Sequence, residues 1–237
     1  MTTPIELQDV ELGALARAST GGAAVVMIHD VWGLSDHTRD LAARLARDGI
    51  SVLAVDLYRR ESEVAIENPG VWMRTLSDPQ ALADIQAGAD ALAASGDRVG
   101  VVGFCMGGMY ALMAAAACTG LAAAVPFYGL LSHRHGILFD EQGLDPEKKP
   151  REPLAMAPEV RCPTLAFFGE DDEFVPMDDI RALEAGLAGA PAATEVVVYP
   201  GAGHAFMNDT REDAFRPEIA ADAWDRMTGF LRAELLG

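Results

Sequence analysis

Cys105 is the residue in this sequence best placed to act as a nucleophile. It lies in Gly103-Phe-Cys-Met-Gly107, a G-x-nucleophile-x-G pattern between an apolar run that predicts a strand and an apolar stretch that predicts a helix. Small flanking residues permit a tight strand-to-helix turn, which aims the N-terminus of the helix at the side chain. We therefore expect the backbone N–H of Met106 and the helix dipole to stabilise an oxyanion and to favour the thiolate of Cys105.

An acid and a histidine follow in the chain order that such hydrolytic sites use. Asp172 comes shortly after the predicted strand 164–168, and His204 lies on a glycine-rich loop after the predicted strand 194–199. All three residues thus follow strands at their carboxyl ends, where open α/β sheets place their sites. His204 would take the proton of Cys105 while Asp172 orients the imidazole. Asp171 remains a competitor for the acid role.

The elements that must position these residues alternate between short apolar runs and amphipathic stretches, which predicts an α/β fold with a mostly parallel sheet and helices on both faces. Two segments interrupt this alternation: the charged stretch 59–77, expected to be a loop or short lid, and the proline-rich stretch 133–159, expected to be a surface excursion. The remaining strands are expected at 5–10 and 13–18 as a hairpin, then at 23–28, 50–55, 98–103 and 121–127, and the helices at 35–48, 79–94, 106–118, 178–187 and 217–236. We see no repeat and no linker, so residues 1–237 are expected to form a single domain.

Composition excludes several classes of function. The formal net charge is −18, which disfavours binding to nucleic acid and to anionic membrane surfaces. We expect no targeting segment at the N-terminus and no membrane span. Three cysteines without CxxC spacing argue against a disulfide framework or a zinc site, and the protein is expected to be cytoplasmic.

The catalytic motifs, together with Met27-Ile-His-Asp-Val-Trp-Gly33, Asp56-Leu-Tyr58 and Pro126-Phe-Tyr-Gly129, resemble the dienelactone hydrolase family over nearly the whole chain. The resemblance implies a single α/β-hydrolase domain that uses no metal and no organic cofactor, and a monomer or weak homodimer. It also implies hydrolysis of a small lactone or ester, the type reaction being conversion of dienelactone, a carboxymethylenebutenolide, to maleylacetate.

Several positions depart from the family pattern. The acidic residue after the third strand is usually a glutamate that interacts with the cysteine, but here it is Asp30, which could instead cap nearby backbone. The next residue, Val31, is the expected source of a second oxyanion N–H. The substrate-binding arginine soon after the histidine is missing, since the first arginine is Arg211, and Arg74 is a candidate for a second family arginine. The 133–159 excursion is longer than in the family and could roof the site.

Other residues have structural alternatives beside functional ones. Trp32, Phe127, Tyr128 and Phe206 are candidate pocket walls or ordinary core residues. His29 could touch the site or pack at a strand end. Cys118 and Cys162 are expected in the core, and His133 with His135 lacks the third ligand of a metal site.

The leading hypothesis is hydrolysis of a small lactone or activated ester through an acyl-enzyme at Cys105. One alternative is a general carboxylesterase or thioesterase with the same triad. Another, from a different class, is a non-hydrolytic protein that uses Cys105 as a thiol sensor or in binding a small molecule.

Overall fold

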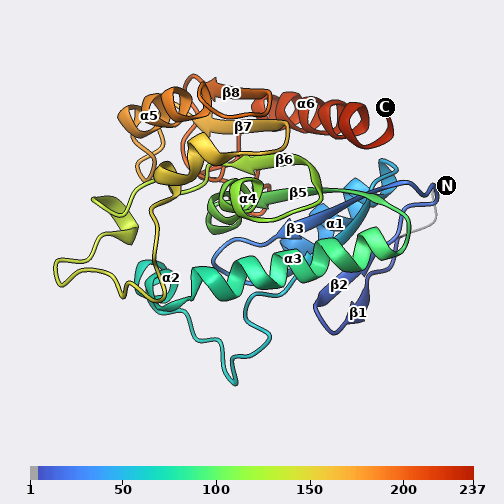
Figure 1. The fold of residues 1–237 in the computed structure, drawn as a ribbon, viewed down its shortest axis with the longest axis horizontal. Coiled ribbons are helices and arrows are strands. Elements are labelled where there is room, and N and C mark those ends of the chain that lie inside the picture. Colours follow the sequence, from blue (N-terminus) through green and yellow to red (C-terminus); the bar gives the residue numbers. More distant parts are fainter. Residues whose placement is uncertain (1–4) are drawn as a thin grey trace.

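Eight strands form one sheet in the computed structural model, which describes residues 5–237 (Figure 1). The strands are β1 (Gln8–Val10), β2 (Gly13–Ala16), β3 (Ala23–Ile28), β4 (Ser51–Val55), β5 (Arg98–Phe104), β6 (Leu121–Phe127), β7 (Thr164–Gly169) and β8 (Thr194–Tyr199). Their order in the sheet is β1-β2-β4-β3-β5-β6-β7-β8. The first two strands form an antiparallel hairpin, β2 pairs antiparallel with β4, and the other pairings are all parallel. The predicted mostly parallel α/β sheet is confirmed.

Helices begin where the sequence supplies caps. Ser35, Asn68 and Ser77 each accept a hydrogen bond from a backbone N–H of the first turn that follows. The α-helices are α1 (Asp36–Arg47), α2 (Pro69–Thr75), α3 (Asp78–Ala94), α4 (Met106–Ala117), α5 (Met177–Leu187) and α6 (Pro217–Leu236), and the 3₁₀ helices are η1 (Gly136–Leu138) and η2 (Pro153–Glu159). No helix within residues 5–237 is both long enough and apolar enough to cross a membrane.

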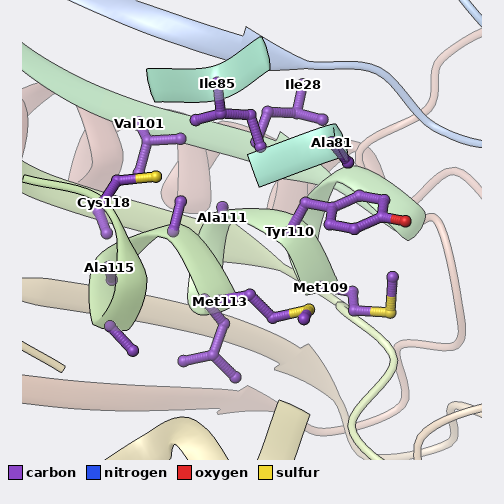
Figure 2. Packing of buried hydrophobic residues seen from close by; sticks show 14 of the residues in the cluster. Ile28, Ala81, Ile85, Val101, Met109, Tyr110, Ala111, Met113, Ala115 and Cys118 are labelled. Atoms are coloured by element: carbon purple, nitrogen blue, oxygen red, sulfur yellow. The ribbon is translucent and has the colours of Figure 1, made fainter. Parts of the chain in front are cut away.

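The helices cover the sheet in two layers, because both faces of its central strands are apolar. Alternate residues of β3 enter opposite core clusters: Val26 and Ile28 belong to the cluster that includes residues of α3 and α4, whereas Val25 and Met27 belong to the one that includes residues of α1 and α6. Figure 2 shows part of the first cluster, where Tyr110 of α4 lies near Ile28 and residues of α3. The two layers hold the strands rigidly. The loops at the carboxyl ends of the parallel strands share one edge of the sheet.

The charged segment 59–77, expected to be a loop or short lid, contains the helix α2. The signal for this helix is local: Asn68 supplies the cap, and Pro69 occupies the first turn, where its missing N–H costs no hydrogen bond. The excursion 133–159 contains the two 3₁₀ helices, and η2 packs against α4 and α5. The nucleophile helix is therefore covered by the excursion as well as by α3.

A buried ion pair anchors the excursion to the rest of the fold. Lys149 Nζ lies 2.6 Å from Asp78 Oδ1 at the start of α3, and both side chains are 1% exposed. The hydroxyl of Tyr110 donates a hydrogen bond of 2.9 Å to the same carboxylate oxygen. Burial lowers the pKa of Lys149, but the contact with Asp78 opposes that effect. The pair thus ties the excursion to both α3 and α4.

Replacing Lys149 by methionine should lower the free energy of unfolding by about 3 kcal/mol, because the carboxylate of Asp78 would remain buried without its cation. Urea unfolding measures this loss. The adjacent Lys148 is exposed, so Lys148→Met is the matched control and should leave stability nearly unchanged. Equal changes in the free energy of unfolding for the two variants would show that the buried pair does not stabilise the fold.

Candidate active site

Cys105 occupies the sharp turn between β5 and α4. Its backbone angles are φ 56° and ψ −116°, a region that non-glycine residues rarely adopt. Gly103 and Gly107 make the turn possible, since a Cβ on Gly103 would collide with the carbonyl of Gly107 and one on Gly107 with that of Ile28. The turn places the thiol at the N-terminus of α4, next to Met106, as the sequence pattern predicted.

The loops that follow β7 and β8, which are neighbours in the sheet, bring an acid and a histidine together. Nδ1 of His204, after β8, lies 2.8 Å from Oδ2 of Asp172, after β7. The other carboxylate oxygen of Asp172 accepts the backbone N–H of Phe174 at 2.8 Å, which fixes the orientation of the carboxylate. Asp171 is exposed, and its hydrogen bond to this region is made by its backbone N–H. The geometry therefore favours Asp172 over Asp171 as the partner of His204.

His204 carries a strongly raised pKa. Burial alone would lower it, but the charge of Cys105 and hydrogen bonds with Asp172 and Cys105 outweigh burial and raise the pKa to about 10. With Nδ1 bonded to Asp172, Nε2 is the ring nitrogen left for an interaction with Cys105. The raised pKa favours the protonated imidazole, which is the condition for a thiolate–imidazolium pair.

Backbone strain gathers around this centre. In the described part of the chain, the non-glycine residues with positive φ are Cys105, Tyr128 and Ala205, the residue after His204. The ring of Tyr128 contacts that of His204 edge-on, with centroids 5.1 Å apart. The ring of Phe174 also contacts it edge-on, with centroids 5.0 Å apart. These rings fix the imidazole from two directions, so its position is set by packing as well as by Asp172.

A cavity of about 130 Å³ opens onto Cys105 and His204. Its walls are mostly apolar and come from the loop after β3, α2, the excursion and the β7–α5 loop. Besides Cys105 and His204, the lining residues are Val31, Trp32, Pro69, Met73, Leu130, Ile137, Phe174 and Arg211. The excursion thus supplies part of the wall through Ile137, in line with the expectation that it covers the site.

Among the four aromatic residues expected as pocket walls, only Trp32 lines the cavity. Phe127 is fully buried and stacks between Phe104 and Phe167, because its position in β6 turns it towards the α1 and α6 layer. Phe206 is fully buried against Tyr128. Phe127 and Phe206 are core residues, and Tyr128 supports His204 rather than forming a wall of the cavity.

Arginine enters the cavity from an unexpected position. Arg74 does not line it: Nη1 donates a hydrogen bond of 2.8 Å to the carbonyl of Ile137, which joins α2 to the excursion. Arg211 does line the cavity, and its Nη2 lies 2.7 Å from Oδ2 of Asp213. The resemblance had pointed to an arginine closer to His204, so loop geometry and not spacing decides which cation reaches the site.

The loop after β3 carries Asp30 and Val31 into the site. Oδ1 of Asp30 accepts a hydrogen bond of 2.9 Å from the backbone N–H of Trp32. This contact matches the backbone-capping alternative for Asp30, the other alternative being a direct interaction with Cys105. Val31 lines the cavity, and Met106 is the first residue of α4 beside Cys105. Residues 5–237 hold no cluster of His, Cys, Asp and Glu that could bind a metal ion.

The fold and the site together define an α/β-hydrolase: a mostly parallel sheet with a nucleophile turn after β5 and an acid and a histidine on loops after later strands. Residues 13–235 match the model of the dienelactone hydrolase family, and the chain belongs to that family. It is a carboxylic ester hydrolase of the dienelactone hydrolase type.

Relatives cover most of the chain. A Bradyrhizobium protein, assigned provisionally as a 2-oxo-3-(5-oxofuran-2-ylidene)propanoate lactonase, is 31% identical over 95% of this chain and 90% of its own. A protein of Escherichia coli K12, provisionally named carboxymethylenebutenolidase, is 31% identical over 86% of this chain and 74% of its own. A crystal structure from Klebsiella pneumoniae, provisionally named dienelactone hydrolase, superimposes with a TM-score of 0.81 at 31% identity, covering 92% of this chain and 91% of the other.

The raised pKa of His204 predicts a measurable reactivity of Cys105. Alkylation of Cys105 by iodoacetamide should fall about tenfold or more at pH 7 in His204→Asn, because a thiol without an imidazolium is only a few per cent ionised there. Mass spectrometry of the labelled peptide follows the reaction and separates Cys105 from the buried Cys118 and Cys162. An unchanged rate would mean that His204 does not stabilise the thiolate.

Proposed function

We propose that this protein hydrolyses small lactones and activated esters through an acyl-enzyme on Cys105, with His204 and Asp172 completing the triad. The observation that carries the proposal is the short contact between His204 and Asp172 beside Cys105 at an apolar cavity. Such a mechanism needs a nucleophile, a proton carrier and an oxyanion site, for which Cys105, His204 and the N–H groups of Val31 and Met106 are the candidates.

Acylation begins with attack of the Cys105 sulfur on the carbonyl carbon of the substrate. The carbonyl oxygen becomes an oxyanion, which would accept hydrogen bonds from the N–H groups of Val31 and Met106. When the tetrahedral intermediate collapses, the ester C–O bond breaks and the leaving oxygen takes the proton of the His204 imidazolium. For an enol lactone the leaving group is an enolate, which needs little help from an acid. The acyl group remains bound to Cys105 as a thioester.

Deacylation reverses the roles. Neutral His204 takes a proton from water, and the resulting hydroxide attacks the thioester carbonyl. The C–S bond breaks, the carboxylic acid departs, and the thiolate–imidazolium pair forms again. Asp172 holds the imidazole in one orientation through both steps and stabilises its charged form.

We further propose that the substrate is an unsaturated lactone that bears a carboxylate. The names of the Bradyrhizobium and Escherichia coli relatives both describe an unsaturated five-membered lactone with an acidic side chain. Arg211 brings a guanidinium to the cavity, next to otherwise apolar walls. It would recognise the carboxylate while Cys105 attacks the ring carbonyl.

Replacing Cys105 by alanine should reduce hydrolysis of cis- and trans-dienelactone and of p-nitrophenyl acetate by more than about a thousandfold, because no thioester can form. Cys118→Ala is the matched control: Cys118 is buried in the core, and its loss should leave turnover unchanged. Full activity in Cys105→Ala would refute the mechanism. Turnover of simple esters without turnover of lactones would instead support the general esterase alternative.

Replacing Arg211 by glutamine should raise KM about tenfold for a lactone that bears a carboxylate, because one charge-assisted hydrogen bond is lost. The matching uncharged methyl ester should show no such change, so the ratio of the two KM values isolates the effect of charge. Arg216, also on the segment between His204 and α6 but bonded to backbone carbonyls, gives the control Arg216→Gln. Equal changes in KM for both substrates would show that Arg211 does not recognise the carboxylate.

A further inference from the structure

Two buried side chains, His29 and Tyr58, shape the loop after β3 and take no part in the proposed chemical steps. This loop carries Val31, whose N–H is proposed above as an oxyanion donor. The two peptide groups on either side of the Val31 Cα are the 30–31 peptide, which contains that N–H, and the 31–32 peptide. The direction of the N–H depends on how these two peptide planes are held.

His29 holds the first peptide plane. Its Nδ1 lies 2.6 Å from the carbonyl oxygen of Asp30, and its Nε2 accepts the backbone N–H of Leu57 at 3.1 Å. Because Nε2 is an acceptor, the proton of the neutral ring is on Nδ1, which donates to Asp30. Burial lowers the pKa of His29, which keeps the fully buried ring neutral. The N–H of Gly33 donates to the same carbonyl at 3.2 Å.

The consequence follows from peptide geometry. In a trans peptide the carbonyl and the N–H point in opposite directions, so anchoring the Asp30 carbonyl also aims the Val31 N–H. A hydrogen bond donated to the carbonyl further polarises the peptide and strengthens its N–H as a donor.

Tyr58 holds the second peptide plane. Its hydroxyl donates a hydrogen bond of 2.8 Å to the carbonyl of Val31 and lies 3.5 Å from Sδ of Met106, the other proposed oxyanion residue. The other end of this peptide, the N–H of Trp32, donates to Asp30. The ring of Tyr58 is buried and contacts His29 edge-on, with centroids 4.7 Å apart.

We propose that His29 and Tyr58 are positioning residues that together fix and polarise the Val31 N–H for the oxyanion. This inference rests on the proposed acyl-enzyme mechanism. It gives a role to the Asp56-Leu-Tyr58 segment, which follows β4 and reaches the neighbouring strand end through Leu57 and Tyr58. Neither side chain touches the substrate; both act through the backbone of residues 30–32.

Two reactions of Cys105 separate this role from a general structural one. Acylation by p-nitrophenyl acetate passes through an oxyanion, whereas alkylation by iodoacetamide is a displacement that needs the thiolate but no oxyanion site. Tyr58→Phe keeps the ring and removes only the hydroxyl. We expect its acylation rate to fall about tenfold, less than the loss of a whole oxyanion donor, while alkylation stays unchanged. Tyr110→Phe removes another buried hydroxyl, bonded to Asp78, and should change neither rate.

His29 offers a second, matched pair of variants. Asparagine can replace the donor at Nδ1 but not the acceptor at Nε2, and glutamine can replace the acceptor but not the donor. Both changes lose one buried hydrogen bond, so both should lower the melting temperature. His29→Asn should acylate within about threefold of the wild type, whereas His29→Gln should lose about tenfold, as expected for a weakened oxyanion donor.

Each outcome decides the matter. Selective loss of acylation in Tyr58→Phe and His29→Gln supports the proposal. Normal acylation in Tyr58→Phe, equal rates in the two His29 variants, or parallel loss of acylation and alkylation would overturn it. If wild-type Cys105 forms no acetyl adduct in the mass spectrum, the acyl-enzyme mechanism itself fails, and this result is distinct from failure of the positioning role.

Discussion

The turn at Cys105 is the constraint on which the rest of the site depends. A side chain can leave the end of a central strand and face outward only if the chain reverses direction within one residue, and Cys105 does so with φ 56°. Close packing surrounds that conformation: the end of β3 lies against Gly107 and the end of β6 against Gly108, with no room for a Cβ on either glycine. The sheet, buried on both faces, provides the rigidity that keeps a strained residue in place.

Electrostatics around the turn follow from the same packing. His204 is buried deeply enough that an isolated imidazole would lose its charge, but Asp172 and Cys105 reverse the balance. For the fully buried His29, burial outweighs the charges of Asp56 and Asp30, and its pKa is lowered. The pKa values of two buried histidines at the carboxyl edge of one sheet are thus shifted in opposite directions by their surroundings.

Much of this arrangement could be predicted from the sequence, because its signals are local. The glycines around Cys105, the apolar runs before it and the order of acid and histidine each depend on a few neighbouring residues. The helix α2 was missed although its cap was present, because the surrounding charge suggested a loop. The cavity walls could not be predicted in the same way. Phe127 and Phe206 turn into the core, and Ile137 and Arg211 reach the site only because distant segments dock there.

The separate anchoring of the excursion has a consequence for how such an enzyme can diversify. Cys105, Asp172 and His204 are placed by strand ends, whereas the wall around Ile137 is held by Arg74 and, farther along the chain, by the pair of Lys149 with Asp78. Neither attachment involves Cys105 or His204. Mutations of the wall at Ile137 can therefore reshape the cavity without displacing those two residues. Substrate range and reactivity thus depend on different parts of the chain and can change independently in evolution.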